Sequence, residues 1–231
     1  MYLRKALKEL ADPILADKAR RFFKTGKGEY SEGDRFMGIR VPVIRQQVLL
    51  FRDTPRADLL RLLHSPWHEE RQAALLLLVD QFQPAGKQAQ QECYSLYLAN
   101  TVHINNWDLV DCSAHPIVGA WLESRSRRPL FTLARSHSLW ERRIAIVATW
   151  YFIRRRDLDD TLAIAELLLE DPEDLIHKAT GWMLRELGKR DMELLKDFLT
   201  RHYPQLPRTT LRYAIEKFPE PERQRFLRGN L

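Results

Sequence analysis

Short polar or proline-containing breaks divide the chain into segments of helix length. Two of these breaks, Ser65-Pro66 and Asp171-Pro172, fit an N-cap followed by proline at the first helical position. Ser138 and Glu141 have the spacing of a capping box. The irregular segment 25–35 contains three glycines and alternating charges, and it is predicted to be a surface loop. The pattern therefore predicts a succession of helices.

The predicted helices recur at a regular spacing. Trp67, Trp107 and Trp140 each lie near the polar start of a helix, at separations of 40 and 33 residues. Such a period, with two helices in each repeat, is typical of solenoids of helical hairpins, which bury their apolar faces against their neighbours. We therefore expect one all-α domain over residues 1–231, a superhelical solenoid with C-terminal capping helices at 206–231.

The composition agrees with this interpretation. Leu occurs 36 times against 19 for Val and Ile together, which favours helices over strands. Hydrophobic residues make up 45% of the chain, which excludes a disordered protein. No apolar run is long enough to span a membrane, and the N-terminus starts a charged helix rather than a signal peptide. We expect a soluble, cytoplasmic protein.

The net charge of +6 is modest, so the positions of the charges matter more than their sum. Equivalent positions of successive repeats should align in a stacked array. Four of the aligned positions are basic and one is acidic: Arg71, Asp111, Arg143, Lys178 and Arg212. This register predicts a basic ladder on a concave inner face, suited to tracking phosphates. The alternative is that each basic residue merely solvates an exposed helix surface.

Two helices combine tryptophan with charged residues. Trp107 and Asp111 are four residues apart, so the indole and the carboxylate should project from one face. Lys178, Trp182 and Arg185 share a face in the same way. An indole beside a charged side chain is suited to stacking on a nucleotide or a cation. These residues are the candidates for chemistry.

Other candidates are weaker. Asp108 lies in the first helical turn, where a carboxylate complements the helix N-terminus, and this structural role suffices. Gly181 costs about 1 kcal/mol relative to Ala in a helix, so a neighbouring helix or a ligand should pack closely there. The seven histidines are scattered, and Cys93 and Cys112 lack metal-ligand spacing, so we expect no metal site.

Five motifs together resemble the AlkD-type DNA alkylation repair family, whose members are DNA glycosylases built from HEAT-like helical repeats. They are FMGIRVP, WDLVD, LWERRIAI, HKATGWMLRE and LRYAIEKFPE. The resemblance extends from about Ala19 to Phe218 and implies hydrolysis of the N-glycosidic bond of cationic alkylated purines, chiefly N3-methyladenine and N7-methylguanine. In the same family, N-terminal helices contribute to lesion recognition.

The resemblance also implies roles for individual residues. Trp107, Asp111 and Trp182 match the catalytic cleft, Arg143 matches an arginine that holds the DNA backbone, and Arg185 falls where a further backbone contact is expected. It implies that the lesion base is not turned into a deep pocket. The partner would be duplex DNA containing alkylated bases, with no cofactor, and the protein would act as a monomer.

The implied chemistry suits these residue types. A purine alkylated at N3 or N7 is already cationic and leaves without the protonation that glycosidases obtain from a carboxylic acid. A fixed carboxylate can stabilise the remaining oxocarbenium-like sugar and orient water.

Two other functions remain open at this stage. The first is a non-catalytic module that binds bent or branched DNA through backbone contacts alone, with steep salt dependence. The second is a protein-interaction solenoid, which would not depend on the basic residues.

Overall fold

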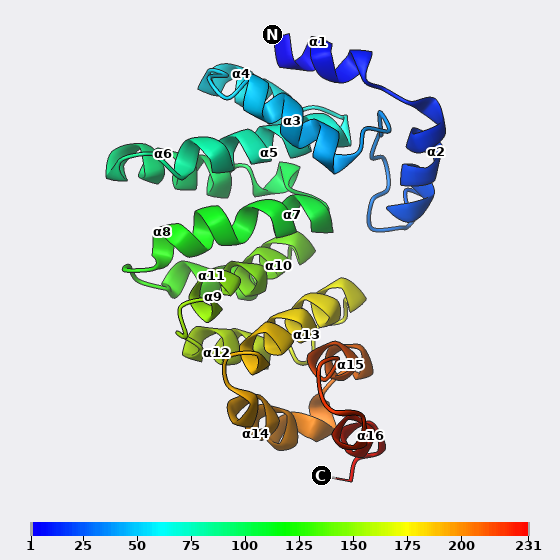
Figure 1. The fold of residues 1–231 in the computed structure, drawn as a ribbon, viewed down its shortest axis with the longest axis vertical. Coiled ribbons are helices and arrows are strands. Elements are labelled where there is room, and N and C mark those ends of the chain that lie inside the picture. Colours follow the sequence, from blue (N-terminus) through cyan, green and yellow to red (C-terminus); the bar gives the residue numbers. More distant parts are fainter. Residues whose placement is uncertain (1, 231) are drawn as a thin grey trace. The chain divides into compact units, whose positions relative to one another are not determined.

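Residues 2–230 are described by the computed structural model. Within this range the regular elements are all helical, and the β-type pairing is limited to an isolated bridge between Arg35 and Trp67 (Figure 1). This confirms the prediction of an all-α protein. None of the helices in the same range is long and apolar enough to cross a membrane.

The chain divides by its internal contacts into two compact units, one ending at Ser113 and the other beginning at Ala114. The helices of the first unit are α1 (Tyr2–Glu9), α2 (Pro13–Phe22), α3 (Val41–Leu50), α4 (Arg56–Leu63), α5 (His68–Phe82), α6 (Lys87–Ala99), the 3₁₀ turn η1 (Thr101–His103) and α7 (Trp107–Ala114), whose last residue begins the second unit.

Helix α5 is the centre of the first unit, because α1, α3, α4 and α6 all pack against it. Its first turn is unusual, since five consecutive polar residues, 68–72, are buried. One of them, Glu69, accepts hydrogen bonds from the backbone N–H groups of Met37, Gly38 and Ile39, at 2.9, 2.8 and 3.2 Å. These bonds fix the segment between α2 and α3 on the start of α5.

The segment predicted as a loop at 25–35 contains no helix: it forms turns and irregular structure between α2 and α3, and its last residue, Arg35, makes the isolated bridge to Trp67. Gly28 and Gly33 adopt positive φ angles of 77° and 84° in these turns, a conformation that costs glycine little.

Gly38 holds the irregular segment close to α2, and replacing it should be costly. Its φ of 83° disfavours any side chain, and a Cβ atom would overlap the backbone of Asp12 and Ala16. We expect Gly38→Ala to lower the free energy of unfolding by about 3 kcal/mol in urea denaturation. Gly28→Ala is the matched control, because its φ is similarly positive but nothing lies within 4 Å. Equal losses in the two variants would contradict the packing argument.

The second unit continues with a π-helical turn, η2 (His115–Gly119), and further helices. They are α8 (Ala120–Leu122), α9 (Arg128–Ala134), α10 (Leu139–Ala148), α11 (Trp150–Ile153), α12 (Asp159–Leu167), α13 (Asp174–Gly188), α14 (Met192–His202), the 3₁₀ turn η3 (Tyr203–Gln205), α15 (Arg208–Ala214) and α16 (Glu220–Arg228). The last two occupy the segment predicted to cap the array.

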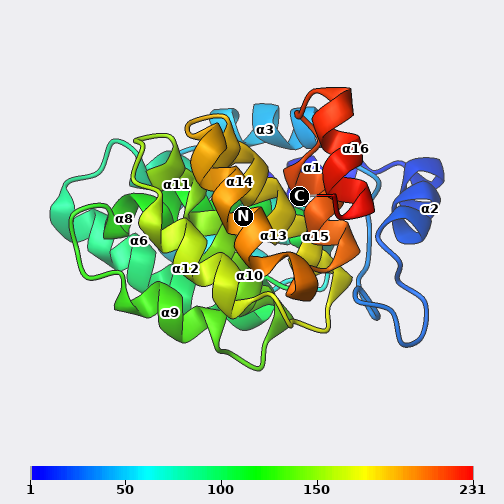
Figure 2. The same cartoon turned by 90° about the horizontal axis from the view of Figure 1, so that it is seen from below.

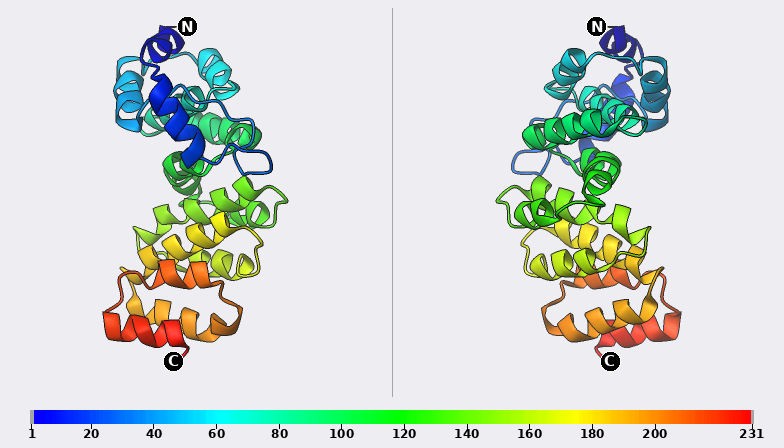
Figure 3. Two further views of the ribbon diagram at one scale, coloured as in Figure 1. Left: turned by 90° about the vertical axis from the view of Figure 1, so that its right-hand side faces the viewer. Right: turned by 90° about the vertical axis from the view of Figure 1, so that its left-hand side faces the viewer.

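The helices of this unit stack in two rows (Figures 2 and 3). Helix α13 packs between α10 and α15, while α9 and α12 contact each other in the second row. A Cβ atom on Gly181 of α13 would overlap Thr210 and Tyr213 of α15, so the close neighbour expected at this glycine is a helix. The row α10, α13, α15 places consecutive repeats side by side, as the repeat spacing predicts.

The predicted helix starts agree only in part with the observed ones. Ser138 caps α10 by accepting a hydrogen bond from Glu141 N–H at 3.4 Å. Helices α5 and α13 begin about two residues later than the Ser-Pro and Asp-Pro signals predict, at His68 and Asp174. At α5 the reason is the bridge to Arg35, whose carbonyl accepts the His68 N–H at 2.8 Å and keeps the preceding residues extended.

Candidate DNA-binding and catalytic residues

The first candidate group lies on α7, which begins at Trp107. The buried side chain of Asn106 caps this helix, because its Oδ1 accepts the Trp107 N–H at 2.8 Å. Its Nδ2 donates to Ser31 Oγ at 2.5 Å. The loop at 25–35 is thereby tied to the helix that carries the candidate catalytic residues, which the sequence alone did not reveal.

Three aromatic rings of the first unit form a stack that begins at Trp107, the first residue of α7. The indole of Trp107 stacks on Phe23 at 5.4 Å with an interplanar angle of 20°, and Phe23 stacks on Phe36 at 5.0 Å and 19°. Phe22, which is 66% exposed, meets Trp107 edge-on at 6.0 Å. One face of Trp107 is therefore covered by protein, and the indole is half-buried rather than a freely standing ring.

Beside this stack lies a buried histidine between two carboxylates. His68 is 2% exposed, with its Nε2 2.8 Å from Asp108 Oδ2 and its Nδ1 3.2 Å from Asp34 Oδ2. Burial by itself would lower the pKa of His68, but the charges and hydrogen bonds of Asp108 and Asp34 outweigh it and raise that pKa to about 9. His68 is therefore an imidazolium at neutral pH, and its ring lies 4.9 Å from Phe23.

The predicted role of Asp108 at the helix N-terminus is extended by these contacts, since it also accepts from Gln72 Nε2 at 3.0 Å. No pattern in the sequence singles out His68, and its ionic role is visible only in the structure. The partners come from positions 34 residues earlier and 40 residues later, so no local spacing could indicate them.

Arg71, the first position of the predicted basic ladder, lies in a buried ion pair rather than on an exposed surface. The residue is only 4% exposed. Its guanidinium forms an ion pair with Asp34 and donates to the Ser65 carbonyl at 3.0 Å. The ion pair with Asp34 compensates the cost of burying the charge of Arg71. The side chain faces the interior of the first unit instead of solvent.

Asp111 lies one turn after Trp107 on α7 and is partly exposed. Its charge acts on neighbouring groups. Burial, together with the charges of Asp108 and Asp111, raises the pKa of the Cys112 thiol, so that cysteine is protonated at neutral pH. Cys112 is therefore a neutral neighbour of Asp111.

The second candidate group lies in the second unit around Trp182 of α13. Trp182 packs against Trp150 at 5.3 Å, and Trp150 packs against His115 at 4.5 Å. Burial and the charge of Arg154 lower the pKa of His115 to about 4, so this ring is neutral at pH 7. Trp182 thus ends an uncharged aromatic cluster, with partners that the helix spacing did not predict.

The basic residues of the second unit differ in accessibility. Arg143 is 5% exposed and donates to the Leu175 carbonyl at 2.6 Å, which joins α10 to α13. Lys178 pairs with Asp174 at 2.8 Å, and Arg185 pairs with Glu216. Arg212 on α15 is exposed.

The structure thus places Arg143, Lys178 and Arg212 on α10, α13 and α15, which pack side by side in one row, in agreement with the predicted register. It does not make them equally open to a ligand, because Arg143 is largely internal. In the described part of the chain, no cluster of three or more histidine, cysteine or carboxylate side chains has the arrangement of a metal site.

Comparison with known proteins gives two findings and one negative result. Residues 3–218 match the sequence profile of the family described as DNA alkylation repair enzyme. A solved structure described as a predicted DNA alkylation repair enzyme from Enterococcus faecalis is 17% identical, has a TM-score of 0.69, and aligns with 91% of this chain and 97% of its own. Curated proteins gave no match. Because the family profile spans nearly the whole sequence, the chain belongs to the DNA alkylation repair enzyme family.

Proposed function

We propose that the protein is a monofunctional DNA glycosylase that hydrolyses the N-glycosidic bond of cationic alkylated purines, N3-methyladenine and N7-methylguanine, in duplex DNA. The observation that carries this proposal is the pairing of Trp107 and Asp111 one turn apart on α7, in a chain of this family. It acts as a monomer without cofactor or metal, in the cytoplasm on nucleoid DNA.

The reaction needs no general acid. The bond between C1′ and the purine nitrogen breaks with its electron pair moving to the base, which neutralises the positive charge of the alkylated ring. Water then adds to C1′ and loses a proton, leaving an abasic site. Asp111 stabilises the positive charge that develops on the sugar and orients the water. The indole of Trp107, on the same helix, offers a negative face to this charge. Trp182 is proposed as a further catalytic residue because it matches the family's catalytic cleft.

For Trp107, the support is its fixed position. Phe23 covers one face of the indole, so the ring is held before substrate arrives. A preorganised group loses less conformational freedom on binding than one that must be ordered. The N-glycosidic bond would be hydrolysed without transfer of the lesion base into a deep pocket, unlike in most glycosylases.

In this proposal the DNA backbone is bound by Lys178, Arg185 and Arg212. Arg143 makes a smaller contact, because little of its side chain is accessible. Each phosphate neutralised by such a side chain releases condensed counterions, so affinity should fall steeply with salt.

Base release from methylated duplex DNA tests the proposed activity. The wild-type protein should release N3-methyladenine or N7-methylguanine, detected by chromatography, and should leave the abasic strand uncut until alkali is added. Unmethylated duplex of the same sequence is the control. Tight, salt-dependent binding without base release would instead support a non-catalytic binder of bent or branched DNA.

The basic row can be tested separately by the salt dependence of binding. Arg212→Ala should reduce the slope of log Kd against log salt by about 1 between about 50 and 200 mM. The measurement is fluorescence anisotropy with a labelled duplex. Arg223→Ala on α16 is the matched control, because it removes an arginine outside the row and should leave the slope unchanged. If Arg212→Ala leaves the slope as unchanged as Arg223→Ala does, the result would support a protein-interaction role.

A further inference from the structure

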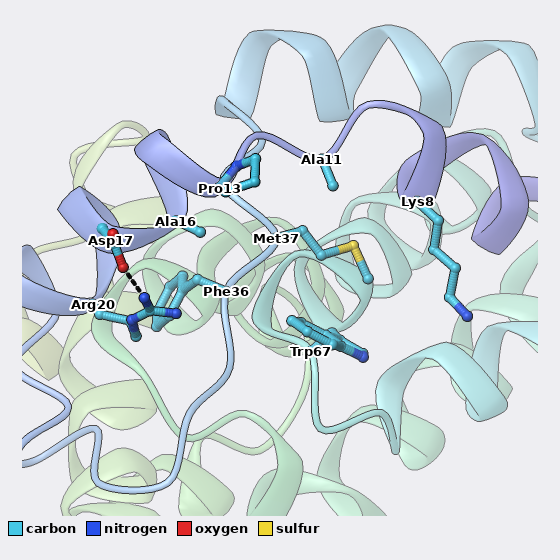
Figure 4. A pocket seen from close by; sticks show the side chains of 9 residues that line it. All are labelled: Lys8, Ala11, Pro13, Ala16, Asp17, Arg20, Phe36, Met37 and Trp67. Atoms are coloured by element: carbon cyan, nitrogen blue, oxygen red, sulfur yellow. Dashed lines mark hydrogen bonds and ion pairs between the residues drawn. The ribbon is translucent and has the colours of Figure 1, made fainter.

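The first unit contains a pocket that the proposed reaction does not use. It has a volume of about 490 Å³ and lies where α1, α2 and the segment before α5 meet (Figure 4). The lining comes from Lys8, Ala11, Pro13, Ala16, Asp17, Arg20, Phe36, Met37 and Trp67. Sites for small molecules span about 300–1,000 Å³, so the pocket is large enough for one.

The interior wall of the pocket is aromatic and apolar. Phe36 and Met37 are almost fully buried, while Trp67, which also lines the pocket, is half-buried. A half-buried indole with a thioether and a phenyl ring beside it offers a stacking surface for a planar heterocycle. This wall favours a flat ring over a branched aliphatic ligand.

The rim of the pocket is charged. In Figure 4, Lys8 lies on one side of Trp67, and Arg20 with its ion-pair partner Asp17 lies on the other, next to Phe36. Two cations against one anion leave the rim with an excess positive charge. The surrounding segment 2–24 has seven Lys and Arg against three Asp and Glu, an excess of four in a chain of net charge +6. An anionic ligand is therefore favoured here.

The pocket is joined to the candidate catalytic helix by one ring. Phe36 lines the pocket and also ends the aromatic stack that runs through Phe23 to Trp107. A ligand that touches Phe36 would therefore contact a side chain two rings away from Trp107.

We propose that this pocket binds a purine nucleotide, with the base stacked against the half-buried Trp67 and the phosphate at the cationic rim, held by Lys8 at one end or by Arg20 at the other. The shared chemistry of a planar base and a phosphate fits both a free mononucleotide and an unpaired nucleotide of a DNA strand. Binding here does not depend on the proposed glycosylase activity.

Isothermal titration with 2′-deoxyadenosine 5′-monophosphate tests the proposal for the free nucleotide. It should bind at least about tenfold more tightly than deoxyadenosine or inorganic phosphate alone, because each lacks one half of the recognised chemistry. Phosphate binding as tightly as the nucleotide would overturn the stacking of the base.

Variants of the rim locate the site. Lys8→Ala combined with Arg20→Ala should weaken nucleotide binding by about tenfold or more. Lys5→Ala combined with Lys18→Ala is the matched control, because these exposed residues lie on the same two helices but do not line the pocket. If both double variants weaken binding equally, the effect comes from general surface charge, and the proposal is wrong. Trp67→Leu should also weaken binding, and its circular dichroism melting curve checks that the variant folds.

Binding of an unpaired nucleotide within a DNA strand is tested with two labelled duplexes. One contains a single unpaired adenosine, and the other is fully paired. If the pocket takes an unpaired base, the Lys8/Arg20 variant loses the preference for the first duplex. If neither the free nucleotide, at up to about 10 mM, nor the unpaired adenosine is bound in a rim-dependent way, the site does not exist. Base release from methylated DNA by the same rim variant shows separately whether the proposed activity holds.

Discussion

Replacing Asp111 with asparagine should slow the release of alkylated purines by about 10²- to 10³-fold, because the variant keeps the size of the side chain but loses its charge. In the proposed mechanism, that charge stabilises the oxocarbenium-like sugar only while the bond is breaking. The loss should therefore appear in the single-turnover rate of base release rather than in the affinity for DNA. The measurement is chromatography of bases released from N-methylated duplex with enzyme in excess.

The matched control is Glu92→Gln on α6, which removes an exposed carboxylate from the same unit. It should leave the single-turnover rate unchanged. The Asp111→Asn variant should bind methylated DNA at least as tightly as the wild type, because a negative charge near phosphates has been removed. Release at the wild-type rate by Asp111→Asn would contradict the catalytic role.

The second large effect concerns stability and involves His68. The folded state raises the pKa of His68 from 6.5 to about 9, which corresponds to a stabilisation on the order of 3 kcal/mol. Protons are bound more tightly in the folded chain, so this stabilisation is complete below pH 6.5 and is lost as the pH rises through 9. His68→Gln removes the titrating group and should abolish this part of the pH dependence.

Urea denaturation of both proteins between pH 6 and 10 measures the effect. The difference in free energy of unfolding between wild type and His68→Gln should shrink over this range. His137→Gln provides the control, because His137 is exposed and its removal should leave the pH profile of the wild type intact. Titration of the His68 ring by nuclear magnetic resonance gives the pKa directly, and a value near 6.5 would contradict the ion-pair assignment.

Much of the fold could be predicted from the sequence because the signals are local or periodic. The excess of leucine, the polar breaks and the recurring tryptophans suffice for an all-helical chain with repeats. The spacing also placed Arg143, Lys178 and Arg212 on helices α10, α13 and α15, which are neighbours in the structure. The family resemblance, carried by motifs spread along the chain, is confirmed by the profile match over residues 3–218.

The polar interior could not be predicted, because its partners are distant in sequence. Arg71 occupies a ladder position by spacing, yet Asp34 from the loop pairs with it inside the first unit. The same loop supplies Ser31 to the cap of α7. A repeat period reports which helix positions are equivalent, but it cannot show which of them a non-repeating loop will cover.

The buried polar start of α5 also has a consequence for the order of folding. Its five residues gain partners from α1, from the segment before α3 and from α7, as Arg4 with Glu70, Met37 with Glu69 and Asp108 with His68 show. These contacts close chain loops of many tens of residues, which slows their formation. The first turn of α5 should therefore be the last part of the first unit to reach its native structure. In hydrogen exchange during refolding, the amides of Met37 and Gly38 should be among the last to be protected.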